Sequence, residues 1–300
     1  MQIRGWELGL GGLLLLIWLM GCTAVSTPPP TPILPRNPTA IPTPTPVVVE
    51  PTAALLPTDT AVTQTATTLP PITPDTGWEA IHPGLARRIL HLFNENGAAI
   101  EQLYILRINP YFYEFQVNYH PGNPQMLPAW QAETNALVVI NGGYFTEEFL
   151  ATGRIIANGE ATGVSYGEFA GMFTVMNVGP DVRWLGERPY SPDEPIQHAL
   201  QSFPMLVKPG GLLGYPEEDG RPNRRTVIGK DNVGNILIII TPWGHFTLHA
   251  LSQFLVNSDL NLDVALNLDG GTSSGLILAE PYEAVSGYVP VPAIISIYPK

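Results

Sequence analysis

The chain has 300 residues, with 26 acidic and 14 basic side chains, a net charge of −12 and a single cysteine. It contains no run of basic residues, so a nucleic acid is not expected as a partner. Four of the acids and two of the bases precede residue 77, so residues 77–300 hold 22 acids and 12 bases. That segment is long enough for one sizeable hydrophobic core.

The first 22 residues have the pattern of a secretory signal. Arg4 lies in a short N-terminal region, an apolar run extends over Leu8–Met20, and Cys22 follows Gly21. A run of about 13 residues is too short to span a bilayer as a helix. Its end resembles a bacterial lipobox, which implies cleavage before Cys22 and lipidation of that cysteine. The alternative is a signal with an incidental cysteine. The lipobox resemblance predicts an extracytoplasmic protein, lipid-anchored to the bacterial cell membrane.

Residues 23–76 are predicted to form a disordered linker. Threonine and proline make up more than half of this segment, and no helical or strand periodicity is present. Such a composition favours extended polyproline II structure and cannot bury enough apolar surface to fold. We expect a semi-rigid spacer that contributes nothing to folding.

The globular part, residues 77–300, is predicted to open with a helix over residues 82–97. Apolar side chains recur there at helical spacing, at Leu85, Ile89, Leu92 and Phe93. Pro83 lies near the start and Gly97 follows the end, as is common at helix termini. If lipidation consumes the only cysteine, this part has no disulfide and no thiol chemistry.

The remaining elements are mostly strands. Alternating or continuous apolar runs predict strands over residues 101–108, 113–119, 136–140, 235–240 and 264–269. A second helix is predicted over residues 247–260, between the last two of these strands, which gives a strand–helix–strand unit. The sequence therefore predicts an α+β fold, a single sheet-rich mixed α/β domain with two or three helices.

Polar groups gather at the ends of three predicted strands. Asn141 ends one strand and is followed by Gly142 and Gly143. Arg224 and Arg225 directly precede a further apolar segment, Thr226-Val227-Ile228-Gly229, which is also expected to be a strand. The third strand runs into a carboxylate, a glycine pair and hydroxyls, comprising Asn267, Asp269, Gly270, Gly271, Ser273 and Ser274. Each of these motifs alone also fits an ordinary turn.

The combined chemistry suits an anionic, oxygen-rich ligand. Backbone amides beside a glycine turn can cradle an anion, and the planar guanidinium of arginine binds phosphate through two hydrogen bonds. A partly desolvated carboxylate can act as a general acid or base. A sugar phosphate would use all of these groups.

The motifs resemble a known family. NGGYF, LQSFPMLV, RRTVIGKDNVGNILIII, TLHALSQFL and ALNLDGGTSSGL occur in the order and spacing of the phosphodiester glycosidase family. The likeness extends from about Leu103 to a last predicted strand, VPVPAIISIY, at residues 289–298, and so covers nearly the whole globular part. Thr272 departs from the family pattern, which has a third glycine there.

The resemblance implies roles for the residues at the strand ends. Asp269 would be the acid/base or nucleophilic carboxylate, Arg225 would hold the phosphodiester, and Asn141 would hydrogen-bond to sugar or phosphate. The other candidates would bind substrate or shape the site, namely Gly142, Gly143, Asn267, Gly270, Gly271, Ser273 and Ser274. Arg224 is expected to be a surface neighbour.

The implied activity is extracytoplasmic hydrolysis of a sugar-1-phosphodiester bond in a glycan or cell-surface polymer, such as an exopolysaccharide. The alternative is a non-catalytic surface lectin that binds anionic cell-wall or capsule polysaccharide. Trp184 and Trp243 are candidates for stacking on sugar rings, with core or rim packing as the alternative.

Metal binding is not expected at the one cluster that invites it. His245 and His249 are four residues apart, and Asp259 and Asp263 follow. His245, however, precedes the predicted helix rather than lying on it. No organic cofactor is expected either, and the sequence leaves open whether a divalent cation takes part.

Overall fold

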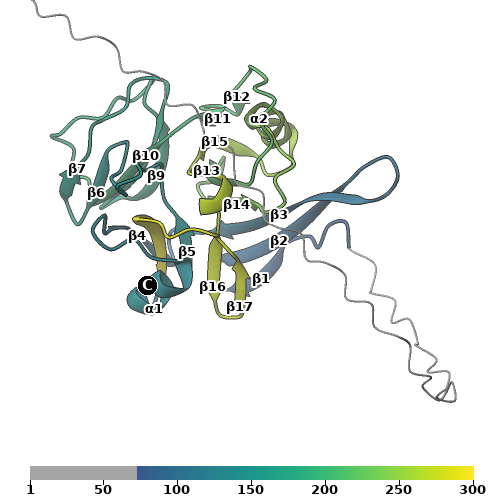
Figure 1. Ribbon diagram of the computed structural model, residues 1–300, viewed down its shortest axis with the longest axis horizontal. Helices are drawn as coiled ribbons and strands as arrows, with labels where there is room; N and C mark the ends of the chain where they lie inside the picture. The colour runs from purple at the N-terminus through teal and green to yellow at the C-terminus, as the bar shows by residue number, and fades with distance from the viewer. Residues whose placement is uncertain (1–72) are drawn as a thin grey trace, which may run out of the picture. The chain divides into compact units, whose positions relative to one another are not determined.

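The computed structural model describes residues 73–300, which form three antiparallel β-sheets and two α-helices (Figure 1). The predicted signal segment, with Cys22, and the predicted linker up to residue 72 lie outside the described residues. Neither helix of the described part has the length and hydrophobicity needed to cross a bilayer.

The largest sheet has eight strands in the order β1-β2-β3-β14-β13-β15-β11-β12. Its strands are β1 (Glu79–His82), β2 (Leu85–Phe93), β3 (Ala99–Ile108), β11 (Met205–Lys208), β12 (Leu212–Leu213), β13 (Arg225–Asp231), β14 (Ile236–Thr241) and β15 (Leu262–Asn267). β13 pairs antiparallel with both of its neighbours, β14 and β15. β14 and β15 therefore run parallel to each other.

Two five-stranded sheets complete the fold. One has the order β7-β6-β10-β8-β9 and comprises β6 (Ile155–Ala157), β7 (Glu160–Thr162), β8 (Gly171–Met176), β9 (Gly179–Trp184) and β10 (His198–Ser202). The other has the order β17-β16-β5-β18-β4 and comprises β4 (Tyr113–Tyr119), β5 (Val138–Asn141), β16 (Leu276–Ala279), β17 (Tyr282–Val285) and β18 (Ala293–Pro299).

The main hydrophobic core lies between the sheets. It contains Ile238 from β14, Ile140 from β5 and Phe173 from β8, all fully buried. A strand such as β14 is buried on both faces because α2 and its neighbours cover the second face, with Leu251 and Leu255 in a separate apolar cluster. The prediction of a sheet-rich fold with two or three helices is confirmed for the described residues, which contain two α-helices, but these residues are mostly β rather than an even mixture of helix and strand. The arrangement into three sheets is set by contacts between distant segments, which local patterns do not encode.

The predicted opening helix over residues 82–97 is also wrong. Gly84, with φ +74°, makes the tight turn between β1 and β2, and β2 then pairs with β3 along its whole length. The apolar side chains fit helical spacing as well as a strand, and pairing with β3 decides the outcome. Arg88 on β2 is buried and donates hydrogen bonds to Asp75 at 2.6 and 2.9 Å and to Asp259 at 2.8 and 3.0 Å.

The second predicted helix is confirmed as α2 (Leu248–Asn257). Thr247 caps its N-terminus, and the threonine hydroxyl accepts a hydrogen bond from the N–H of Ala250 at 3.1 Å. α2 connects β14 to β15 and so confirms the strand–helix–strand unit, although β13 lies between the two strands in the sheet. A short helix that the periodicity did not predict, α1 (Leu127–Thr134), packs the buried Trp130 against β5 and β16.

The last residues of the predicted linker belong to the sheet region. The N–H of Thr76 donates to the carbonyl of Ile89 at 3.0 Å, and the N–H of His91 donates to the carbonyl of Pro74 at 2.7 Å. Together with the Asp75–Arg88 ion pair, these bonds tie residues 73–76 to β2.

Candidate active site

The three strand ends with polar groups meet at one place. Val227 of β13 pairs with Asn267 of β15, so the start of β13 lies beside the end of β15. The end of β5 joins them from another sheet, because the N–H of Asp269 donates to the carbonyl of Gly142 at 3.1 Å. Segments separated by more than a hundred residues thus build one site.

Asn141 is the junction of these segments. Its side chain is fully buried, and its Nδ2 donates to the carbonyls of Asp269 at 2.8 Å and Gly142 at 3.3 Å. Its Oδ1 accepts from the hydroxyl of Thr226 at 2.8 Å and the N–H of Gly275 at 3.1 Å. Both donors and both acceptor positions of the amide are therefore used within the protein.

Asp269 supplies the carboxyl group of the site. Burial raises the pKa of this carboxyl to about 6, although hydrogen bonds from the Ser273 hydroxyl and the N–H of Gly270 favour the charged form. The bond from Gly270 to Oδ1 measures 2.8 Å. A carboxyl with this pKa changes protonation state close to neutral pH, as a general acid or base must.

Arg225 brings a buried positive charge to the start of β13. The residue is 7% exposed, and its guanidinium donates to the carbonyls of Arg221 at 2.7 Å and Phe246 at 3.4 Å. Within residues 73–300, no carboxylate oxygen lies within 4.0 Å of it. Burial lowers the pKa of Arg225, yet an arginine stays charged in proteins. A buried cation without a carboxylate partner is suited to binding an anion.

Tyr144 is a site residue that the sequence analysis did not nominate. Its hydroxyl accepts a hydrogen bond from Nδ2 of Asn267 at 2.8 Å. Burial, with the nearby negative charge of Asp269, raises the pKa of Tyr144, and the positive charge of Arg225 opposes this shift. The phenol therefore keeps its proton at neutral pH and lies within electrostatic reach of both groups. The tyrosine in the NGGYF motif was the available signal.

The four glycines at the strand ends, Gly142, Gly143, Gly270 and Gly271, mainly allow the strand ends to pack closely. A Cβ on Gly142 would lie 2.9 Å from the carbonyl oxygen of Ala293, and one on Gly143 would lie 2.9 Å from that of Gln201. Three of the four N–H groups are used within the protein, since those of Gly142, Gly270 and Gly271 donate to Ala293, Asp269 and Arg224. Most of these amides therefore support the site rather than face a ligand.

Ser273 and Ser274 follow the turn at Gly270 and Gly271, and Arg224 contacts that turn through its backbone carbonyl. The Ser273 hydroxyl favours the charged form of Asp269 and so opposes the effect of burial on its pKa, whereas Ser274 is fully buried and its Oγ has no partner in the described part of the chain. Arg224 is 9% exposed and donates to the carbonyls of Ser274 at 2.9 Å and Ser286 at 2.7 Å. The expectation that Arg224 is a surface neighbour is wrong, because its guanidinium fixes the loop that follows Asp269.

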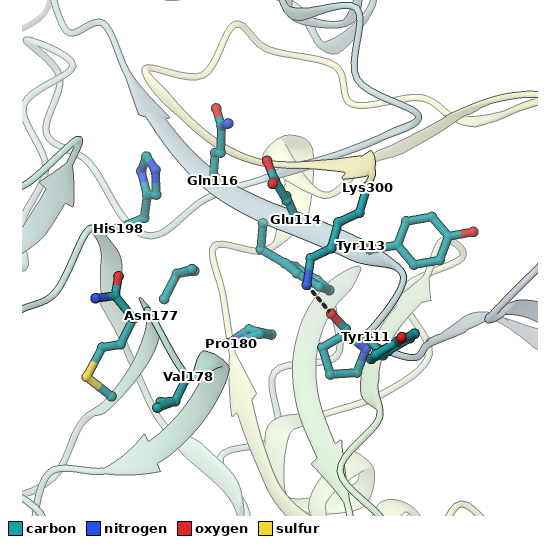
Figure 2. A pocket seen from close by; sticks show the side chains of 14 residues that line it. Tyr111, Tyr113, Glu114, Gln116, Asn177, Val178, Pro180, His198 and Lys300 are labelled. Carbon is teal, nitrogen blue, oxygen red and sulfur yellow. Dashed lines mark hydrogen bonds between the residues drawn. The ribbon is translucent and has the colours of Figure 1, made fainter.

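A cavity with aromatic walls adjoins the site through Tyr144, whereas neither Asp269 nor Arg225 lines it. It measures about 350 Å³ and includes Tyr144, whose ring lies 4.7 Å from that of Phe203. A larger cavity of about 500 Å³ lies between β4 and the β8–β9 hairpin, where Lys300 donates to the carbonyl of Pro110 at 2.9 Å (Figure 2). Neither Tyr144 nor any polar residue of the three strand ends lines that larger cavity.

No group of three or more histidine, cysteine, aspartate or glutamate side chains in residues 73–300 could hold a metal ion. The two histidines that invited a metal interpretation have other contacts. His249 Nδ1 is 3.0 Å from the carbonyl oxygen of Tyr215, whereas the contact of His245 is made by its backbone N–H, which donates to the carboxylate of Glu101 at 2.8 Å.

The phosphodiester glycosidase family model matches residues 134–297, which include all three strand ends. The chain belongs to the phosphodiester glycosidase family, and the resemblance stated from its motifs is confirmed. No curated protein matches the chain in sequence.

Solved structures show the same fold at low sequence identity. The catalytic domain of zebrafish N-acetylglucosamine-1-phosphodiester α-N-acetylglucosaminidase, auto-inhibited by pro-peptide, has a TM-score of 0.59 and 19% identity, covering 74% of this chain and 86% of that one. A hypothetical protein from Synechocystis has a TM-score of 0.53 and 14% identity, covering 72% and 62%. A Burkholderia pseudomallei protein described as a candidate exported protein has a TM-score of 0.50 and 13% identity, covering 68% and 75%.

Proposed function

We propose that this protein is an extracytoplasmic hydrolase that cleaves the glycosidic bond of a sugar-1-phosphodiester in a glycan or cell-surface polymer. The observation that carries the proposal is the presence, at adjoining strand ends, of a buried Arg225 without a carboxylate partner and of a carboxyl, Asp269, whose pKa burial raises to about 6. Family membership supports it, as does the name of the zebrafish enzyme, which specifies a sugar-1-phosphodiester substrate.

Arg225 is proposed to bind the phosphodiester. Its guanidinium already spends two hydrogen bonds on backbone carbonyls, which fix its orientation, and a diester anion would supply the missing negative charge. Folding has already removed water from the guanidinium, so substrate binding need not supply that desolvation free energy. The electrostatic attraction between the guanidinium and the bound anion is therefore strong.

Asp269 is proposed to act as the general base. It would take a proton from the water that attacks the anomeric carbon. The new bond joins the water oxygen to that carbon, the bond from carbon to the phosphate oxygen breaks, and the phosphomonoester leaves with the electron pair. Arg225 would stabilise the charge on the departing phosphate. Phosphate is a good leaving group, so the ordinary pair of carboxylates of glycosidases is not required.

Tyr144 and Asn141 are proposed to act beside this pair. The Tyr144 hydroxyl accepts from Asn267, which leaves its own proton free to donate to a substrate oxygen. Asn141 has no donor or acceptor left for substrate, so we propose it as a positioning residue that joins the loops of Gly142 and Asp269.

The proposed setting is outside the cytoplasm, with residues 1–22 as a lipoprotein signal, 23–76 as a linker and 77–300 as the enzyme domain. The signal-like sequence ending at Cys22 supports this proposal. The structural relative described as a candidate exported protein is consistent with it.

Hydrolysis of a simple substrate tests the function. The full chain is incubated with a hexose 1-(methyl phosphate), and reducing sugar and methyl phosphate are both measured. The proposal requires both products from the wild type and a loss of about 10²-fold or more in turnover for Asp269→Asn. Asp193→Asn, at an exposed carboxylate, is the control and should keep full activity. Binding of an anionic polysaccharide without release of either product would instead support a surface lectin.

A further inference from the structure

The aromatic cavity beside Tyr144 has the build of a sugar-binding subsite. Its volume, about 350 Å³, lies in the range of small-molecule sites. Its walls are mainly flat rings, contributed by Tyr144, Phe169, Trp184, Phe203 and Tyr215. Ring faces bind the apolar C–H faces of a pyranose, and the few polar groups at such a site determine which sugar is accepted.

The cavity contains one cation that the protein does not neutralise. Lys208 is half-buried, and its ammonium lies 4.3 Å from the centre of the Trp184 ring. Across residues 73–300, no carboxylate oxygen lies within 4.0 Å of it, whereas Lys230 pairs with Asp181. Glu168 also lines the cavity, but it is exposed and its contact with Trp184 is through its carbonyl oxygen, at 2.6 Å.

We propose that this cavity binds the sugar ring of the substrate and that Lys208 selects a sugar carrying a carboxylate, that is, a hexuronic acid. The inference rests on the proposed function, which places the phosphodiester between Arg225 and Asp269. Tyr144 lines the cavity, and its hydroxyl accepts a hydrogen bond from Asn267, two residues before Asp269, so the cavity adjoins the strand ends. The ring that bears the anomeric carbon would therefore lie against the aromatic walls.

The preference for an acidic sugar is local. Residues 77–300 hold more acids than bases, so the long-range field of the domain does not attract anions. Discrimination between an acidic and a neutral ring must therefore come from a short-range contact, and Lys208 is the cation in the cavity that can make it. Replacing this one side chain should remove the preference.

Matched substrates test the proposal with the full chain. Glucose 1-(methyl phosphate) is compared with glucuronic acid 1-(methyl phosphate), and the galactose and galacturonic acid pair is measured alongside. We expect the wild type to prefer the acidic member of a pair by about tenfold or more in kcat/KM, as for a hydrogen bond to a charged group. Lys208→Gln should lose this preference, so that its kcat/KM values for the acidic and the neutral member of a pair become equal. Lys300→Gln, which removes a charge at the separate cavity of Figure 2, should keep the preference.

Equal kcat/KM values for the two members of each pair in the wild type, or a preference that survives in Lys208→Gln, would overturn the inference. If no substrate is hydrolysed, the proposed function fails. The sugar subsite is then tested separately, by binding of a free acidic sugar. Free glucuronate is titrated while tryptophan fluorescence is recorded, with Trp184→Phe as the reference. A saturable change that Lys208→Gln abolishes supports the subsite, and the absence of any change in the wild type rejects it.

Discussion

The substitution Asp269→Asn should stabilise the folded protein at alkaline pH while it lowers turnover by about 10²-fold or more. Burial raises the pKa of Asp269 from an ordinary 3.8 to about 6, so the folded state opposes ionisation of this carboxyl. An amide of the same shape removes the charge and can still accept the hydrogen bond from the N–H of Gly270. The ionised carboxylate of Asp269 thus lowers the stability of the fold, although the proposed reaction requires it.

The magnitude follows from linkage between protonation and folding. Because the pKa is higher in the folded chain than in the unfolded chain, the unfolded chain loses this proton first as pH rises. The wild type therefore loses stability between about pH 4 and pH 6 and stays at the lower value above that range. A shift of about two units corresponds to about 3 kcal/mol at most. We expect Asp269→Asn to be about 1–3 kcal/mol more stable than the wild type at pH 8 and equally stable at pH 4.

Urea denaturation followed by tryptophan fluorescence at pH 4 and pH 8 measures this difference directly. Subtracting the wild-type value at each pH cancels the titration of all other groups. Asp193→Asn, at an exposed carboxylate, serves as the control and should change stability little at either pH. The reasoning is refuted if Asp269→Asn is less stable than the wild type at pH 8, as expected for a residue that only caps the turn at Gly270.

Three further predictions follow from the same site. Since Asp269 must be ionised to act as a base, kcat should be constant above about pH 7 and fall as pH drops through about 6; a profile that is flat down to pH 4.5 would exclude it as the base. Arg225→Lys should raise KM about as much as Arg225→Ala does, because an ammonium cannot reproduce the planar guanidinium, and steady-state kinetics of both variants would show whether lysine rescues binding. Cys22→Ser should move the protein from the membrane fraction to the soluble fraction, and a variant that stays with the membrane would place the anchor elsewhere.

Local patterns predicted the elements whose stability is local. The helix at residues 247–260 has a capping threonine and an apolar face, and both features act within the segment itself. The strands β3, β4 and β14 have clear alternating or continuous apolar runs. The helix predicted over β2 was wrong because the apolar side chains of this segment fit both helical and strand periodicity. Only the pairing of β2 with β3 decides for the strand.

The site was predictable as a set of residue types but not as an arrangement. Motifs at three strand ends indicated an acid, an arginine and an amide, yet nothing local distinguishes Arg225 from Arg224, whose side chain fixes a loop instead. The role of Asn141 depends on four partners, of which only Gly142 is its neighbour in the sequence, whereas Thr226, Asp269 and Gly275 belong to distant segments. The aromatic cavity is likewise assembled from several separate segments, so Lys208 gave no signal before the fold was known.

The central claim, that a glycosidic bond is broken rather than a bond to phosphorus, is tested most directly by isotope labelling. Wild-type protein hydrolyses a hexose 1-(methyl phosphate) in water enriched in oxygen-18, and mass spectrometry locates the label in the products. Attack at the anomeric carbon predicts oxygen-18 in the sugar and none in methyl phosphate. Label in the phosphate would show cleavage of a bond between phosphorus and oxygen, and would contradict the role assigned to Asp269.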